Sequence, residues 1–149
     1  MTGWSWVRSA SVLGFFGVAI GAFGAHGWKG RLDALGTAAT FETAVQYHFV
    51  HTLALLAVGL IFRSATVTTA GSVAGWGFLV GVVVFSGSLY ALALTGYRIL
   101  GAITPLGGLA FLVGWAALAV AAGSPDGTVE PRRIADPVLS SRLPDEVRH

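Results

Sequence analysis

The side chains of this chain that can do chemistry gather in short stretches between long apolar runs. The main stretch, FETAVQYHFVHTLALLAVGLIF at residues 41–62, carries Glu42, Tyr47, His48 and His51. Four more candidates lie in the GAFGAH stretch upstream and the FSGSLY stretch downstream: His26, Ser86, Ser88 and Tyr90. Imidazole binds zinc, copper and iron and titrates near neutral pH, so these residue types indicate metal binding or proton transfer.

Three histidines, His26, His48 and His51, are the candidate ligands for a metal. His48 and His51 are three residues apart and share one helical face, and Glu42 can supply an oxygen ligand. The chain has no HExxH motif, and histidines near a membrane interface often bond to backbone carbonyls or lipid headgroups. We therefore predict a hydrogen-bonding role for the histidines, with no metal and no cofactor. Binding of a metal, haem or quinone by the histidines is the alternative.

No catalytic residue is predicted, so we expect that the protein is not an enzyme. Ser86 and Ser88 lie in GSLY, which lacks the GxSxG pattern of a serine nucleophile. The glycine-rich GAFGAHG lacks the strand and lysine of a phosphate loop. The absence of cysteine excludes thiolate sites and disulfides. Glu42 is interpreted as a favourable charge near a helix N-terminus, or as a partner of Lys29 or Arg31.

The composition is that of a membrane protein. Of the 149 residues, 54% are hydrophobic and 11% are charged, whereas soluble domains carry about 25% charged residues. These charges are too few to cover a soluble surface. The basic residues are scattered, so nucleic-acid binding has no support. We predict an all-α integral membrane four-helix bundle over residues 1–123, with the lipid bilayer as its first partner.

Four segments lack charged side chains and have about the ~20 residues that a membrane helix needs: residues 9–28, 43–62, 70–96 and 105–122. The first can also be interpreted as a signal peptide, with Arg8 in its n-region and cleavage near Gly24. Gly17, Gly21 and Ala25 form a ridge of small residues, which favours a retained and packed helix. A short segment at residues 31–35 is expected to lie flat at the membrane surface.

Glycine spacing predicts where the helices pack. Gly17 and Gly21 in the first span, and Gly77 and Gly81 in the third, are four residues apart. This small-xxx-small pattern lets two helix backbones approach closely. We therefore expect both pairs to face another helix.

The predicted topology also indicates where the candidate side chains meet. His26 ends the first span, and His48 and His51 follow the start of the second, so a hairpin is expected to bring all three to one membrane interface. Tyr47 lies beside them at the same end of the helix. Tyr90 joins them only if the third helix packs beside the second at the right depth.

Residues 124–149 differ from the rest, with four prolines, mixed charges and few aliphatic side chains. Such a composition cannot bury enough apolar surface to offset chain ordering, so a disordered tail is predicted. Basic residues near the spans set orientation. The side that holds both termini carries Arg8, Arg63, Arg132 and Arg133, and the other side carries Lys29, Arg31 and Arg98. Cytoplasmic termini in the inner membrane are predicted from this bias.

Four ordered motifs resemble a known family. They are GAFGAH at 21–26, FETAVQYHFVHTLAL at 41–55, FSGSLYALALTG at 85–96 and ITPLGG at 103–108. The resemblance is to the bacterial domain-of-unknown-function family 423, also called UPF0382 inner-membrane proteins, with small eukaryotic transmembrane relatives. It covers roughly residues 8–122 and implies a multi-pass helical membrane protein, but no reaction. Trp28 departs from the more usual aliphatic residue before the lysine.

Three functions are compatible with these patterns. The first is a non-enzymatic scaffold or accessory subunit of a membrane complex, with other subunits or a second copy as partner; the glycine-rich faces motivate it, because four helices cannot bury all of them. The second is a small transporter or channel that acts as an oligomer. The third is the histidine-based metal, haem or quinone site described above.

Overall fold

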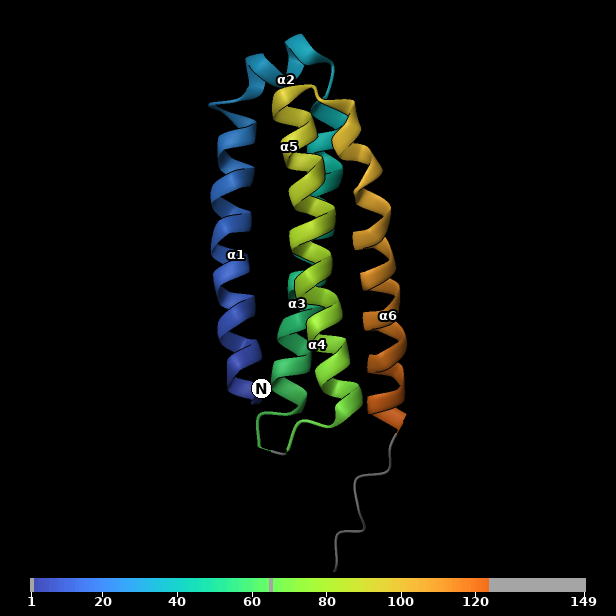
Figure 1. Cartoon of the computed structure of the whole chain (residues 1–149). Helices are drawn as coiled ribbons and strands as arrows, with labels where there is room; N and C mark the ends of the chain where they lie inside the picture. Colours follow the sequence, from blue (N-terminus) through green and yellow to red (C-terminus); the bar gives the residue numbers. More distant parts are fainter. Residues whose placement is uncertain (1, 65, 124–149) are drawn as a thin grey trace, which may run out of the picture.

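The computed structural model describes residues 2–64 and 66–123, and these residues contain helices and no strand. Four long helical segments lie side by side (Figure 1), and each is long and apolar enough to cross a membrane. They are α1 (Gly3–Ala25), α3 (Ala38–Ile61), the run of α4 (Thr69–Gly81), η1 (Val82–Ser86) and α5 (Gly87–Thr95), and α6 (Thr104–Gly123). The predicted all-α membrane four-helix bundle is confirmed. The predicted tail at residues 124–149 lies outside the described residues.

The helices begin earlier than the apolar windows of the sequence predict. α1 begins at Gly3 rather than Ser9, because the Thr2 side chain accepts a hydrogen bond from the Ser5 amide and caps the helix. Arg8 therefore lies within α1, where it is exposed. α3 begins at Ala38 rather than Thr43. Charged residues such as Arg8 and Glu42 can belong to these end turns because their side chains are exposed.

The arrangement places α3 at the centre of the packing. α3 contacts α1 on one side and the α4–η1–α5 run on the other, and α6 packs along α4. α1 and α6 therefore form opposite flanks of the bundle (Figure 1). The start of α1 and the end of α6 lie at the same end, and α2 (Lys29–Leu35) crosses the other end.

Three of the four predicted packing glycines lie tightly against another helix. A Cβ added to Gly77 of α4 would lie 2.7 Å from the Gly114 Cα of α6, and one added to Gly81 would lie 2.3 Å from the Phe111 ring. A Cβ at Gly17 would lie 3.1 Å from the Phe49 ring. Gly21 differs, since its nearest neighbour, the Val45 side chain, would be 3.8 Å away. Only ordinary van der Waals contact would result there.

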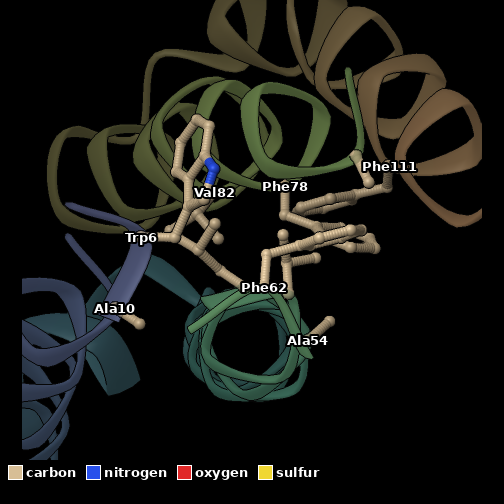
Figure 2. Packing of buried hydrophobic residues seen from close by; sticks show 10 residues of the cluster. Trp6, Ala10, Ala54, Phe62, Phe78, Val82 and Phe111 are labelled. Atoms are coloured by element: carbon tan, nitrogen blue, oxygen red, sulfur yellow. The ribbon is translucent and has the colours of Figure 1, made fainter. Parts of the chain in front are cut away.

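A core of large side chains joins the helices near the end that holds the start of α1. Figure 2 shows Phe78 and Phe111 pointing into the space between α4, α6 and α3, within a cluster that includes Phe62. Trp6 of α1 is fully buried and reaches α4, where a Cβ on Gly75 would lie 2.5 Å from its indole ring. Trp6 thus connects the outer helix α1 directly to α4.

The segment between α1 and α3 caps the end of α5. The Arg31 guanidinium donates a hydrogen bond to the Leu94 carbonyl, and the Thr37 hydroxyl donates one to the Ala93 carbonyl at 2.7 Å. α5 ends at Thr95 and is followed by Gly96, whose φ of 77° places it in the left-handed region. The last carbonyls of a helix have no partner within it, so these two donors from a neighbouring segment stabilise the helix end.

Removing the Thr37 hydroxyl is expected to weaken this cap. Thr37→Val keeps the side-chain shape but leaves the carbonyl of the buried Ala93 without its donor, which should lower the free energy of unfolding by about 0.5–1.5 kcal/mol. Thr43→Val is the matched control, because the Thr43 hydroxyl bonds only to Ala39 of its own helix. Chemical unfolding in detergent measures both variants, and equal stability of the two would contradict the capping role.

Candidate functional site

A hydrogen-bonded chain crosses three helices at His48. Its Nε2 lies 2.9 Å from the Leu13 carbonyl oxygen of α1, and its Nδ1 lies 3.3 Å from the Tyr90 hydroxyl of α5. A carbonyl oxygen can only accept, so Nε2 carries the proton and Nδ1 accepts from Tyr90. A neutral His48 therefore has both ring nitrogens partnered, and it is only 4% exposed. His48 connects α1, α3 and α5.

Gly17 gives His48 its access to α1. Gly17 is one turn beyond Leu13, and a Cβ added there would lie 3.4 Å from His48 Cδ2. This distance is at the edge of ordinary van der Waals contact, and the Phe49 ring would be nearer, at 3.1 Å. A small residue at Gly17 therefore lets α1 lie close to both His48 and Phe49.

His51 has a different environment from His48. Its Nδ1 lies 2.8 Å from the Tyr47 carbonyl oxygen in the same helix, and its ring stacks on Phe111 of α6 with 3.4 Å between ring centroids. The bond to a carbonyl places the proton on Nδ1, so Nε2 is an acceptor. Nε2 has no hydrogen-bond partner in the described part of the chain and is not fully enclosed. His51 therefore presents a fixed acceptor.

His51 lies at the edge of a groove between α3 and α6. The groove has a volume of about 780 Å³, within the ~300–1,000 Å³ of typical ligand sites. Its walls are mainly aromatic and aliphatic, with the polar side chains of Gln46, Tyr47 and His51 on the α3 side. The lining residues are Gln46, Tyr47, Val50, His51, Phe85, Pro105, Gly108, Leu109, Phe111, Leu112 and Trp115. The Tyr47 ring stacks on Phe85 with 4.5 Å between centroids.

The two serines of FSGSLY have different roles. The Ser88 hydroxyl lies 2.9 Å from the Phe85 carbonyl and 2.8 Å from the Thr104 hydroxyl at the start of α6. Thr104 is the first residue of α6, and its side chain faces α5. Ser86 is fully buried and its hydroxyl has no partner among the described residues.

The structure does not bring His26 or Glu42 to His48. His26 follows the last residue of α1 and is exposed, and Glu42 is exposed beside a surface cleft of about 450 Å³ between α1, α2 and α3. His48 and His51 lie in the middle third of α3, not at its interfacial end, because the helix begins at Ala38. Within residues 2–64 and 66–123, no three His, Asp or Glu side chains gather to hold a metal ion.

Three polar residues near this site were not among the site candidates predicted from the sequence: Gln46, Thr52 and Thr104. Thr52 is buried one helical turn after His48. The spacing of four residues would have predicted that the two side chains share one face of the helix. Gln46 adjoins Tyr47 but looks like an ordinary polar residue. Thr104 is detectable only through its partner Ser88, which is 16 residues away in the chain.

Comparison with known proteins gives several relatives. The model of the family described as "Protein of unknown function (DUF423)" matches residues 20–108. The chain is 50% identical over 104 residues to a UPF0382 membrane protein of Staphylococcus epidermidis, which covers 70% of this chain and 83% of the relative. It is 45% identical over 105 residues to the UPF0382 membrane protein YwdK of Bacillus subtilis, covering 70% and 85%. A Haemophilus influenzae UPF0382 membrane protein is 43% identical over 109 residues, covering 73% and 86%. No solved structure matches the chain.

The family match includes α3 and α5 and therefore His48, His51 and Tyr90. The relatives are named as membrane proteins, which agrees with the four spans, and the inner membrane fits these bacterial relatives. The motifs, the match over more than half of the chain and the identity to these relatives lead to one conclusion: the chain belongs to the DUF423 family of UPF0382 membrane proteins.

Proposed function

We propose that this protein is a non-enzymatic accessory subunit, a scaffold that binds a transmembrane helix of a partner subunit in the groove between α3 and α6. The supporting observation is that polar side chains in the middle third of α3 open on this groove. Tyr47 is 40% exposed, and Gln46 is exposed beside it. The glycine faces give this function less support than the sequence suggests, because internal helix contacts occupy Gly77, Gly81 and Gly114.

Polar groups at this depth are stabilised by a neighbour that can form hydrogen bonds. Lipid tails offer no such groups, so a polar side chain that faces them loses the hydrogen bonds it would make in water. The Gln46 amide, the Tyr47 hydroxyl and His51 Nε2 all lack a hydrogen-bond partner within the described ranges. Side chains of this kind hold helices together in membranes.

The shape of the groove suits a helix. Each wall is a stripe of residues about one turn apart on a single helix, and the space between two such stripes is where a third helix packs. Val50 and His51 belong to the α3 stripe, and Gly108, Leu112 and Trp115 belong to the α6 stripe.

His51 specifies the chemistry of the partner. Since its Nδ1 proton is held by the Tyr47 carbonyl, Nε2 can only accept. The partner helix is therefore expected to present a donor at this level, such as a serine, threonine, asparagine, glutamine, tyrosine or tryptophan side chain.

Filling the groove is expected to release the partner. Val50 lines the groove and is 47% exposed, and the nearby Leu53 is 62% exposed but does not line it. In mild-detergent extracts, Val50→Trp should recover about tenfold less co-purifying membrane protein than wild type, equivalent to ~1.4 kcal/mol of binding free energy. Leu53→Trp, the matched control, should recover as much as wild type, and both variants should keep the wild-type Tm.

Two outcomes would count against the scaffold. Equal recovery from the two tryptophan variants would remove the groove from the interface. Native mass spectra with only a monomer, or only copies of this chain, would remove the heterologous partner.

A lipid-soluble ring compound, such as a quinone or quinol, is the second candidate occupant. The stacking of His51 on Phe111 and the aromatic walls favour a flat ligand, and the groove volume is that of a small-molecule site. Lipid extraction followed by mass spectrometry distinguishes the two occupants. A stoichiometric ring compound that Val50→Trp loses and Leu53→Trp keeps would favour the ligand over the helix.

A further inference from the structure

Two buried hydroxyls in the centre of the bundle have no hydrogen-bond partner. Ser86 is 0% exposed and Thr52 is 5% exposed, and neither hydroxyl has a partner among the residues that the structure describes. A buried hydroxyl without a partner is costly in an apolar environment, so such groups are usually satisfied by protein or by ordered water.

The register of the helices places these hydroxyls in one layer. His48 of α3 is bonded to Tyr90 of α5, and the two helices run in opposite directions. Thr52 lies four residues after His48, and Ser86 lies four residues before Tyr90. One turn along each helix from the bonded pair therefore leads to Thr52 and Ser86 at the same depth.

Neither hydroxyl uses the local bond that other hydroxyls of this chain make. Ser11, Thr43 and Thr95 each donate to the carbonyl four residues back in their own helix. At Ser86 the backbone forms the π-turn η1, in which the Gly87 amide donates to the Val82 carbonyl. The Ser86 hydroxyl makes no bond to its own helix and needs another partner.

The Thr52 side chain is oriented by its contact with α1. Its methyl group, Cγ2, lies 3.9 Å from the position of a Cβ added to Gly14. The hydroxyl is the other branch of the same Cβ, and α3 packs on η1 as well as on α1. The two hydroxyls do not bond to each other, so a molecule between them in this layer would satisfy both.

We propose that Thr52 and Ser86 hold one buried water molecule between α3 and the π-turn. Both hydroxyls are donors as well as acceptors, which a water molecule matches and a metal cation does not. The water fastens the π-turn to α3 one turn from the His48–Tyr90 bond. This site is separate from the α3–α6 groove, which neither residue lines.

The sign of a stability change tests this site. If the hydroxyls hold water, Thr52→Val and Ser86→Ala each remove a bonded group, and the Tm should fall by roughly 2–8 °C. If the hydroxyls are unpartnered, the same changes remove a buried polar group that has no bond, and the Tm should rise. Ser11→Ala is the control, since its hydroxyl is exposed and bonds to its own helix.

A high-resolution density map of the wild-type protein in lipid gives an independent readout. A water peak about 2.7–3.2 Å from both oxygens is expected. The proposal is overturned by empty density between the two oxygens, or by a higher Tm in both variants. Should a variant fail to accumulate, the wild-type map alone decides.

Discussion

Gly77→Ala is expected to destabilise the bundle more than a single added methyl group normally does. The new Cβ would lie 2.7 Å from the Gly114 Cα and 2.8 Å from the Ala110 carbonyl oxygen, against ~3.5–4.0 Å for comfortable contact. These neighbours are backbone atoms, which cannot rotate away, so α4 and α6 must separate. The free energy of unfolding should fall by about 1–3 kcal/mol, measured by denaturant titration in detergent micelles.

Gly87→Ala supplies the matched control. Gly87 also lies in the third span, but a Cβ there would meet nothing within 4 Å. Alanine should leave stability unchanged, or raise it by up to ~1 kcal/mol through better helix propensity. If Gly77→Ala were as stable as Gly87→Ala, the close α4–α6 contact would not exist in the membrane-extracted protein.

His48 and Tyr90 are expected to be coupled in stability. Tyr90→Phe leaves His48 Nδ1 buried without a donor, which should cost about 1–3 kcal/mol. Once His48 is alanine, the Tyr90 hydroxyl has lost the same bond, so the double variant should be more stable than the sum of the two losses predicts. A coupling of about 0.5–3 kcal/mol is typical of residues in contact. The coupling is measured by unfolding the wild type, the two single variants and the double variant under one condition.

His26 provides the reference for this cycle. It is exposed at the end of α1 and has no hydrogen bond to His48. His26→Ala and His48→Ala should therefore add within about 0.3–0.5 kcal/mol, as distant sites do. Strong coupling of His26 to His48, or none between His48 and Tyr90, would mean that the histidines meet in a different arrangement.

The membrane class and the number of spans were predictable, because both depend on runs of apolar residues that a single chain displays directly. The helix ends were less predictable. Residues near Thr2, and those from Ala38 to Glu42, lie outside the apolar windows that lack charged side chains, yet they belong to helices that begin before those windows. That extension moves His48 and His51 from the interface to the middle of α3.

The contacts of individual side chains depended on packing that spacing alone does not specify. Gly17 and Gly21 look equivalent in sequence, but only Gly17 faces a bulky neighbour, since the α1–α3 crossing brings Phe49 to it. The acceptor role of His51 depends on the Tyr47 carbonyl and on a ring from α6. The groove likewise needs residues of α3, η1 and α6 to meet, which no local pattern indicates.

The way the helices pair within the bundle has a consequence for the order in which the protein folds in the membrane. The most extensive contacts are those of α1 with α3 and of α4 with α6, so the bundle consists of two helical hairpins in chain order. The first hairpin can form while the second is still being synthesised. Trp6 over Gly75 and His48 against Tyr90 then join the two halves. Biogenesis would thus proceed as two insertions followed by one docking step within the bilayer.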